Sequence, residues 1–210
     1  MKIIVFDFDG TLGDSRSLII ATMQQTLKKL GLPSRSDDEC AAMIGLSLRE
    51  SFTRLMPMSE DTGKLCEETY YELFKANNRP GMVKPFPGVV DTIKELYAQG
   101  FTLTIASSRG RDSLVEYVKE MGLSRYISFI VSAWDVKRAK PYPDMVNHIL
   151  DHTDATPSQV LVVGDTRYDI EMGRNAGTKT CGVTYGNGSR EELCEADFVI
   201  SRFSKLLEVV

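Results

Sequence analysis

The sequence has few of the residues that build disulfide frameworks or zinc sites. It contains four cysteines, Cys40, Cys66, Cys181 and Cys194, at irregular spacings without a C-x-x-C pair, and only two histidines. Structural zinc sites need about four cysteine or histidine ligands at short, regular spacings. We therefore expect free thiols in a reducing cytoplasm and no zinc site.

Long apolar runs and an excess of basic charge are also missing. No apolar run reaches the roughly 18 residues that a membrane span requires, and the acidic stretch that begins at Asp7 argues against an N-terminal signal peptide. The net charge is −4 and the isoelectric point is near 5.3, whereas nucleic acids and anionic membranes normally attract a clustered basic face. These features predict a cytoplasmic protein that binds neither nucleic acid nor membrane.

The apolar residues that are present fall into short runs. Six of these runs, several rich in β-branched residues, lie at 2–6, 101–107, 127–131, 159–163, 178–183 and 197–200. From about residue 87 they alternate with stretches of helical spacing, such as Val90, Ile93 and Leu96. This alternation predicts an α/β fold with a doubly wound, Rossmann-like parallel sheet.

One segment, from 15 to 84, interrupts the alternation. Its apolar residues, such as Leu18, Met23 and Leu27, recur at helical spacing, and it contains no convincing strand. Pro80 and Gly81 supply breakers near its end. We predict a core domain formed by residues 1–14 and 85–210, with an inserted helical domain over residues 15–84.

Two acids follow the first predicted strand at an interval of two. Asp7 and Asp9 stand at the carboxyl end of this strand, where open α/β sheets bind their ligands, and Gly10 allows the chain to turn there. A lone D-x-D pattern is equally compatible with a turn that carries two solvated acids. The residues that follow the neighbouring strands favour a ligand site over a solvated turn.

Further polar residues follow the other predicted strands. Ser107 and Ser108 end the second, Asp165 and Asp169 follow the fourth, and Lys140 precedes it in a proline-rich turn. In a doubly wound sheet these ends converge on one edge, so a hydroxyl, an ammonium group and up to four carboxylates meet. Such a set suits a hard cation and a phosphate group.

These residues together resemble the haloacid dehalogenase superfamily over essentially the whole chain. The resemblance rests on four motifs in order: DFDGT from Asp7, the strand ending in Ser107, Lys140 in K-P-x-P, and G-D-x-x-x-D from Gly164. It implies that Asp7 attacks phosphorus to form an aspartyl-phosphate and that Asp9 acts as general acid and base. It also implies that Ser107 holds a phosphoryl oxygen and that Lys140 neutralises the reacting groups.

The resemblance also implies a magnesium site and further contacts. Mg²⁺ would be bound by the carboxylates of Asp7 and Asp165 and by the backbone carbonyl of Asp9, with Asp169 in a supporting position. Gly10, Thr11 and Ser108 would contact the substrate. The superfamily's dehalogenases lack an acid at the position of Asp9, which favours phosphate chemistry for this chain.

Each of these assignments has a structural alternative. Ser107 and Ser108 could cap the following helix, Lys140 could be a surface lysine in a turn, and Asp169 could have a structural role. A binding or regulatory protein without catalysis is the alternative to an enzyme, but Asp7, Lys140 and Asp165 are all present.

The inserted segment resembles the helical cap that closes over the site in this superfamily. Residues 44–50 are similar to the cap loop of phosphoglycolate phosphatases and β-phosphoglucomutases, which implies that Arg49 meets the leaving group. Its alternative is an exposed arginine paired with Glu50 or another acid. The phosphosugar mutases that this chain resembles use a histidine in the cap. The insert contains no histidine, which disfavours a mutase.

The sequence therefore predicts a magnesium-dependent phosphatase, monomeric or weakly dimeric, that acts on a small phosphorylated metabolite such as phosphoglycolate. The alternatives are a β-phosphoglucomutase-type mutase, a pyrophosphatase or a 5'-nucleotidase. Fold alone does not decide among them.

Overall fold

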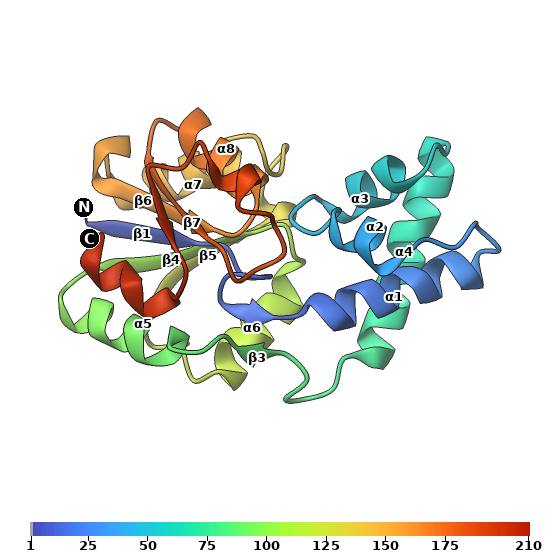
Figure 1. Ribbon diagram of the computed structural model, residues 1–210, viewed down its shortest axis with the longest axis horizontal. Coiled ribbons are helices and arrows are strands. Elements are labelled where there is room, and N and C mark those ends of the chain that lie inside the picture. Colours follow the sequence, from blue (N-terminus) through green and yellow to red (C-terminus); the bar gives the residue numbers. More distant parts are fainter. Residues whose placement is uncertain (1) are drawn as a thin grey trace.

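The computed structural model describes residues 2–210 and contains a parallel sheet with helices on both faces (Figure 1). All six predicted strands are present, in the spatial order β5-β4-β1-β6-β7-β8, and every neighbouring pair is parallel. The α/β fold predicted from the sequence is thus confirmed. The strands are β1 (Ile3–Phe6), β4 (Thr102–Ser107), β5 (Ile127–Ser132), β6 (Val160–Gly164), β7 (Lys179–Val183) and β8 (Phe198–Ile200).

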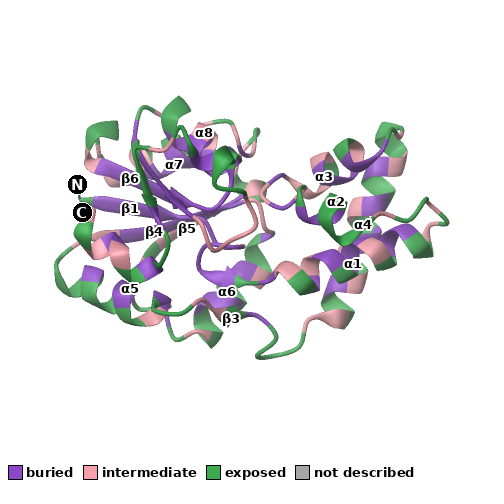
Figure 2. Ribbon diagram, in the orientation of Figure 1, coloured by how far each residue is buried: buried purple, intermediate pink, exposed green. Residues whose placement is uncertain are grey.

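Two helices cover each face of the sheet. The helices are α5 (Val89–Ala98), α6 (Arg111–Glu120), α7 (Asp144–Thr153) and α8 (Arg167–Asn175), with short 3₁₀ turns at Ala133–Asp135, Pro157–Gln159, Glu191–Leu193 and Phe203–Glu208. Successive residues of β1 point to opposite faces. Ile4 and Phe6 join the core cluster that contains α5 and α6, whereas Ile3 and Val5 join the cluster that contains α7. Burial on both faces explains the near-continuous apolar strands (Figure 2).

The segment between the first two long strands is helical, as the sequence predicts. It contains α1 (Arg16–Lys29), α2 (Asp37–Ala41), α3 (Leu48–Leu55) and α4 (Glu60–Asn77), which we call the helical unit and which lie together at one end of the molecule (Figure 1). The two strands β2 (Gly13–Asp14) and β3 (Lys84–Pro85) pair antiparallel where the chain leaves and re-enters the sheet domain. The two chain segments that connect the sheet domain with the helical unit therefore lie side by side.

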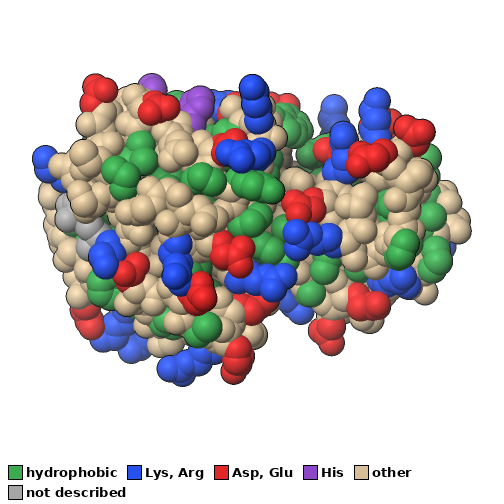
Figure 3. Space-filling model, turned by 90° about the horizontal axis from the view of Figure 1, so that it is seen from above, with side chains coloured by type: hydrophobic (Ala, Val, Ile, Leu, Met, Phe, Trp, Pro, Cys, Tyr) green, Lys and Arg blue, Asp and Glu red, His purple; other side chains and the backbone are tan. Residues whose placement is uncertain are grey.

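Charged side chains of both signs lie on the surface, and the four cysteines form no disulfide. Within residues 2–210, no helix is long and apolar enough to cross a membrane. On the face shown in Figure 3, lysine and arginine side chains lie among aspartate and glutamate side chains. All four cysteines are free, and Cys40, Cys66 and Cys181 are buried.

Candidate active site

The carboxyl ends of three adjacent strands bring the predicted residues together. Asp7 follows β1, Ser107 ends β4 and Asp165 follows β6, and β1 lies between β4 and β6 in the sheet. The chain proceeds from β1 to one side of the sheet through β4 and β5, then returns to the other side through β6. Such a switch in strand order opens a crevice at the carboxyl edge of the sheet.

Lys140 connects two of the acids at this edge. Its side chain is fully buried, and its Nζ donates hydrogen bonds to Asp7 Oδ1 and, at 2.6 Å, to Asp169 Oδ1. Burial lowers the pKa of the Lys140 ammonium group, but the carboxylates of Asp169 and Asp7 outweigh burial and raise that pKa above its ordinary value. Lys140 is therefore a charged member of the site, and the alternative of a surface lysine is wrong.

Three buried carboxylates form a cluster around this ammonium group. Asp7, Asp165 and Asp169 each place an oxygen within 4.8 Å of the others. Burial raises the pKa of Asp7 well above its ordinary value, and it raises the pKa of Asp165 to about 7, in each case with a further contribution from the charge of Asp169. When all three acids are ionised, the cluster holds more negative charge than Lys140 balances.

This excess of charge fits a magnesium ion. Hard divalent cations prefer carboxylate and carbonyl oxygens, and they compensate charge in clusters of this kind. Two of the expected ligands, Asp7 and Asp165, belong to the cluster, and Asp169 joins them. The side chain of Asp9 does not, because its carboxylate is bound elsewhere.

Contacts from two loops orient Asp165. Thr11 Oγ1 donates to its Oδ1 at 3.1 Å, and the backbone N–H of Asn187 donates to its Oδ2 at 2.6 Å. The side-chain amide of Asn187 also donates to the carbonyl oxygen of Asp9 at 3.3 Å. Gly10 has a φ of 93°, and a side chain there would collide with the Asp165 carboxylate. Thr11 and Gly10, expected to contact substrate, thus shape the acid cluster in this structure.

Asn187 was not anticipated from the sequence. It lies in the loop after β7, between Gly186 and Gly188. Two flanking glycines after a buried strand are a signal for close backbone approach, and a side chain at either glycine would collide with Asp165. That signal identifies a tight loop but not its partner.

Asp169 caps a helix and binds Lys140. Its Oδ2 accepts hydrogen bonds from the backbone N–H of Thr166 at 3.0 Å and from its Oγ1 at 2.7 Å, which completes a capping box at the start of α8. Its other oxygen binds Lys140. The helix cap therefore holds the carboxylate that orients the lysine.

Arg109 binds Asp9, a contact that the sequence does not predict. Its Nε and Nη2 donate to the Asp9 carboxylate at 2.9 and 2.6 Å, and Ser15 Oγ donates to Asp9 Oδ1 at 2.5 Å. Burial lowers the pKa of the Arg109 guanidinium, but the charge and hydrogen bonds of Asp9, together with Tyr70 and Tyr117, raise it above its ordinary value, so the group stays charged. The one signal in the sequence was a basic residue directly after Ser107 and Ser108.

The two serines at the end of β4 have different contacts. Ser107 is buried, and its Oγ accepts a hydrogen bond from the backbone N–H of Arg109 at 3.3 Å. Ser108 Oγ donates to the carbonyl oxygen of Gly45 at 2.7 Å and so connects the sheet domain with the helical unit. The N-cap of α6 is Gly110, so the alternative that these serines cap the helix is wrong.

Arg49 lies away from these groups. Its guanidinium donates to Glu67 Oε2 at 3.0 and 2.7 Å, on the exposed side of α3 and α4. Glu50 pairs with Arg54 instead. Arg49 therefore does not make the expected contact here, and the alternative of an exposed, paired arginine describes its position in this structure.

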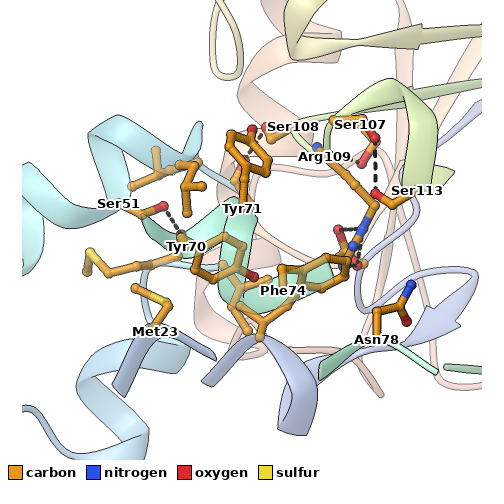
Figure 4. Close-up of a pocket in the computed structure, with 18 of the residues that line it drawn as sticks. Met23, Ser51, Tyr70, Tyr71, Phe74, Asn78, Ser107, Ser108, Arg109 and Ser113 are labelled. Atoms are coloured by element: carbon orange, nitrogen blue, oxygen red, sulfur yellow. Dashed lines mark hydrogen bonds and ion pairs between the residues drawn. The ribbon is translucent and has the colours of Figure 1, made fainter. Parts of the chain in front are cut away.

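A cavity of about 650 Å³ lies between the sheet domain and the helical unit (Figure 4). Its lining includes Asp7, Asp9 and Ser107 from the sheet domain, together with side chains from α1 and α4. A ligand in this cavity would therefore touch the acid cluster and the helical unit at once.

The family model described as haloacid dehalogenase-like hydrolase matches residues 4–183. The chain belongs to this family. The match spans β1 to β7 and thus includes every residue of the acid cluster.

Relatives within the family cover nearly the whole chain. The pyrophosphatase PpaX of Listeria monocytogenes serotype 4a is 31% identical over 211 residues, which cover 99% of this chain and 95% of the relative. The pyrophosphatase PpaX of Bacillus pumilus is 33% identical over 210 residues, with the same shares covered.

Solved structures have the same fold. A putative haloacid dehalogenase-like hydrolase from Bacteroides fragilis is 27% identical with a TM-score of 0.92, covering 98% of this chain and 99% of the other. A predicted phosphoglycolate phosphatase from Haemophilus somnus has a TM-score of 0.88 at 23% identity, covering 100% and 97%, which shows likeness of fold alone.

Proposed function

We propose that this haloacid dehalogenase-like hydrolase is a magnesium-dependent phosphatase that transfers the phosphoryl group of a small phosphomonoester to Asp7 and then to water. The observation that carries the proposal is the buried arrangement of Lys140 between Asp7 and Asp169, with Asp165 in the same cluster. A carboxylate that attacks an anion needs positive charge beside it.

Each residue has a role that its position supports. Lys140 keeps the Asp7 carboxylate oriented and neutralises the phosphoryl oxygens as they arrive. Ser107, which ends the strand beside β1, is placed to donate its hydroxyl to one of those oxygens. Asp9, two residues after the nucleophile, gives a proton to the leaving oxygen and later takes one from water.

Magnesium would be held by Asp7, Asp165 and the carbonyl oxygen of Asp9, with Asp169 beside them. A bound magnesium ion supplies the positive charge that offsets the repulsion between a carboxylate and a phosphoryl group. Residues 15–84 would act as a cap that excludes water from the cavity. We also propose that the substrate is a small phosphorylated metabolite and that the protein is cytoplasmic and monomeric or weakly dimeric.

A pyrophosphatase is the second candidate. The observation that favours it is the identity of 31% to 33% with relatives named pyrophosphatase over 99% of the chain. In both candidates Asp7 receives a phosphoryl group, and they differ only in the leaving group. The mutase has less support, because the helical unit contains no histidine.

Release of inorganic phosphate from an aryl phosphate, measured with and without Mg²⁺, tests the proposal. We expect release that depends on Mg²⁺ and that Asp7→Asn abolishes, because an amide is no nucleophile for phosphorus. A matched control is Asp151→Asn, which replaces an exposed acid on α7. Full activity of Asp7→Asn would contradict the mechanism, and inactivity of the unaltered protein toward all phosphate esters would contradict the function.

A further inference from the structure

The cavity is far larger than the phosphoryl site requires. Its volume of about 650 Å³ corresponds to roughly 20 water molecules at about 30 Å³ each. A phosphoryl group together with a two-carbon acid would fill only part of it. The lining runs from Ser107 and Arg109 on the sheet domain to Met23 and Tyr70 on the helical unit (Figure 4).

The walls of this remaining space are mainly apolar and partly aromatic. Tyr70 stacks on Phe74 with 5.8 Å between ring centroids, and Tyr71 meets Trp134 edge to face at 5.6 Å. The indole N–H of Trp134 donates to the Tyr71 hydroxyl at 3.2 Å, so an aromatic pair bridges the two parts of the chain. The principal apolar lining residues are Met23, Leu48, Tyr70, Tyr71, Phe74 and Trp134.

Positive charge for an anionic leaving group is scarce in the same walls. Arg109 lines the cavity, but its guanidinium is already bound to Asp9 at 2.6 Å. Beyond it, and apart from Asp7 and Asp9, the described lining contributes one cation, Lys75, and two acids, Asp112 and Glu116. A departing phosphate or glycolate carries its own negative charge, which these walls would not compensate.

We propose that the natural leaving group is an uncharged alcohol with a flat, apolar body, so that the substrate is the phosphate ester of an aromatic or heteroaromatic alcohol. The phosphorus–oxygen bond to this alcohol breaks as the bond to Asp7 forms, and Asp9 protonates the departing oxygen. This inference rests on the proposed phosphatase function. It adds to that function the chemical class of leaving group that the cavity selects.

The first experiment compares four substrates with Mg²⁺: benzyl phosphate, ethyl phosphate, phosphoglycolate and pyrophosphate. Benzyl and ethyl alcohol are leaving groups of similar acidity, so they differ mainly in the ring. A single methylene in an apolar pocket is worth about tenfold or more in kcat/KM. We expect kcat/KM for benzyl phosphate to exceed each of the other three by at least about tenfold.

The negative results have different meanings. A kcat/KM for phosphoglycolate or ethyl phosphate equal to or above that for benzyl phosphate overturns the inference and leaves the phosphatase function intact. A kcat/KM for pyrophosphate equal to or above that for benzyl phosphate overturns the inference and favours the second candidate function. Hydrolysis of none of the four overturns the proposed function itself.

A variant locates the contact on the cavity wall. Phe74→Leu keeps an apolar side chain but removes the ring, and it should lower kcat/KM for benzyl phosphate by a larger factor than that for ethyl phosphate. Leu65→Ala is the matched control, because Leu65 is an exposed residue on the same helix outside the cavity lining. An equal loss for both esters would show that Phe74 acts through Arg109, whose guanidinium lies 4.9 Å from its ring, and would contradict the inference.

Binding can be measured without turnover, because Trp134 is the one tryptophan of the sequence and lines the cavity. Titration with benzylphosphonate in the presence of Mg²⁺ should change its fluorescence, with an affinity at least about tenfold above that for ethylphosphonate. Equal affinities for the two phosphonates would overturn the inference.

Discussion

Arg109 and Asp9 are 100 residues apart in the sequence and form a buried ion pair at the centre of the site, with two guanidinium nitrogens on one carboxylate. The Arg109 side chain is only 7% exposed, and the ring of Phe74 from α4 lies 4.9 Å from its guanidinium. In this arrangement both oxygens of Asp9 accept hydrogen bonds. Asp9 Oδ2, which accepts from Nε alone, must therefore exchange this hydrogen bond for the leaving group before Asp9 can transfer a proton, while Oδ1 keeps Nη2 of Arg109.

Loss of this ion pair should cost stability. We expect Arg109→Gln to lower the free energy of unfolding by about 3 to 5 kcal/mol, because it leaves the buried carboxylate of Asp9 without its charge partner. Arg111→Gln is the matched control two residues away, since its pair with Asp135 is about half exposed and should contribute about 1 kcal/mol or less. Urea unfolding of the unaltered protein and of both variants measures these free energies. Equal losses of unfolding free energy in the two variants would contradict the role of burial.

Gly45 is the point where the helical unit approaches the sheet domain. Its carbonyl accepts from Ser108, its φ is 104°, and a methyl group there would lie 2.9 Å from Thr166 Oγ1. We expect Gly45→Ala to lower kcat/KM by about tenfold or more, because small displacements at a site cost large factors in rate.

Gly81→Ala separates this collision from backbone strain. Gly81 also has a positive φ, of 79°, but a methyl group there would meet no atom within 4 Å. Both variants should lose about 1 to 2 kcal/mol of unfolding free energy, and only Gly45→Ala should lose activity. Equal kcat/KM values in phosphate release would show that the contact at Gly45 does not matter for the reaction.

The acid cluster should make the stability of the metal-free protein depend on pH. The pKa of Asp165 is raised to about 7 in the folded protein, mainly by burial, from about 4 in an unfolded chain. A raised pKa contributes stability that is complete below about pH 4 and is lost as the pH rises through about 7. In EDTA, the melting temperature should therefore fall between pH 5 and pH 8.

Magnesium should reverse this loss at pH 8, because it binds the deprotonated carboxylates. At 100 times its Kd, a ligand stabilises the folded state by about 2.7 kcal/mol. Asp165→Asn should weaken both the pH dependence and the response to Mg²⁺, whereas Asp151→Asn should preserve them. A melting temperature that is independent of pH in EDTA, or of Mg²⁺ at pH 8, would argue against the cluster as a cation site.

The sheet and the acids at its edge can be predicted from the sequence alone. Runs of β-branched residues predict strands locally, and parallel strands in a doubly wound sheet must end on one side, so the proximity of Asp7, Ser107 and Asp165 follows from order along the chain. Lys140 could be included because the K-P-x-P motif accompanies the other three in the resembling family.

The directions of the remaining side chains depend on how the helices pack in three dimensions. Arg109 reaches Asp9 because α4 and α6 enclose it with aromatic rings, and Arg49 turns to Glu67 because α3 packs against α4. The apolar cavity likewise exists only where the helical unit meets the sheet domain. These contacts join residues far apart in sequence, and side-chain direction at such junctions depends on packing that no local pattern records.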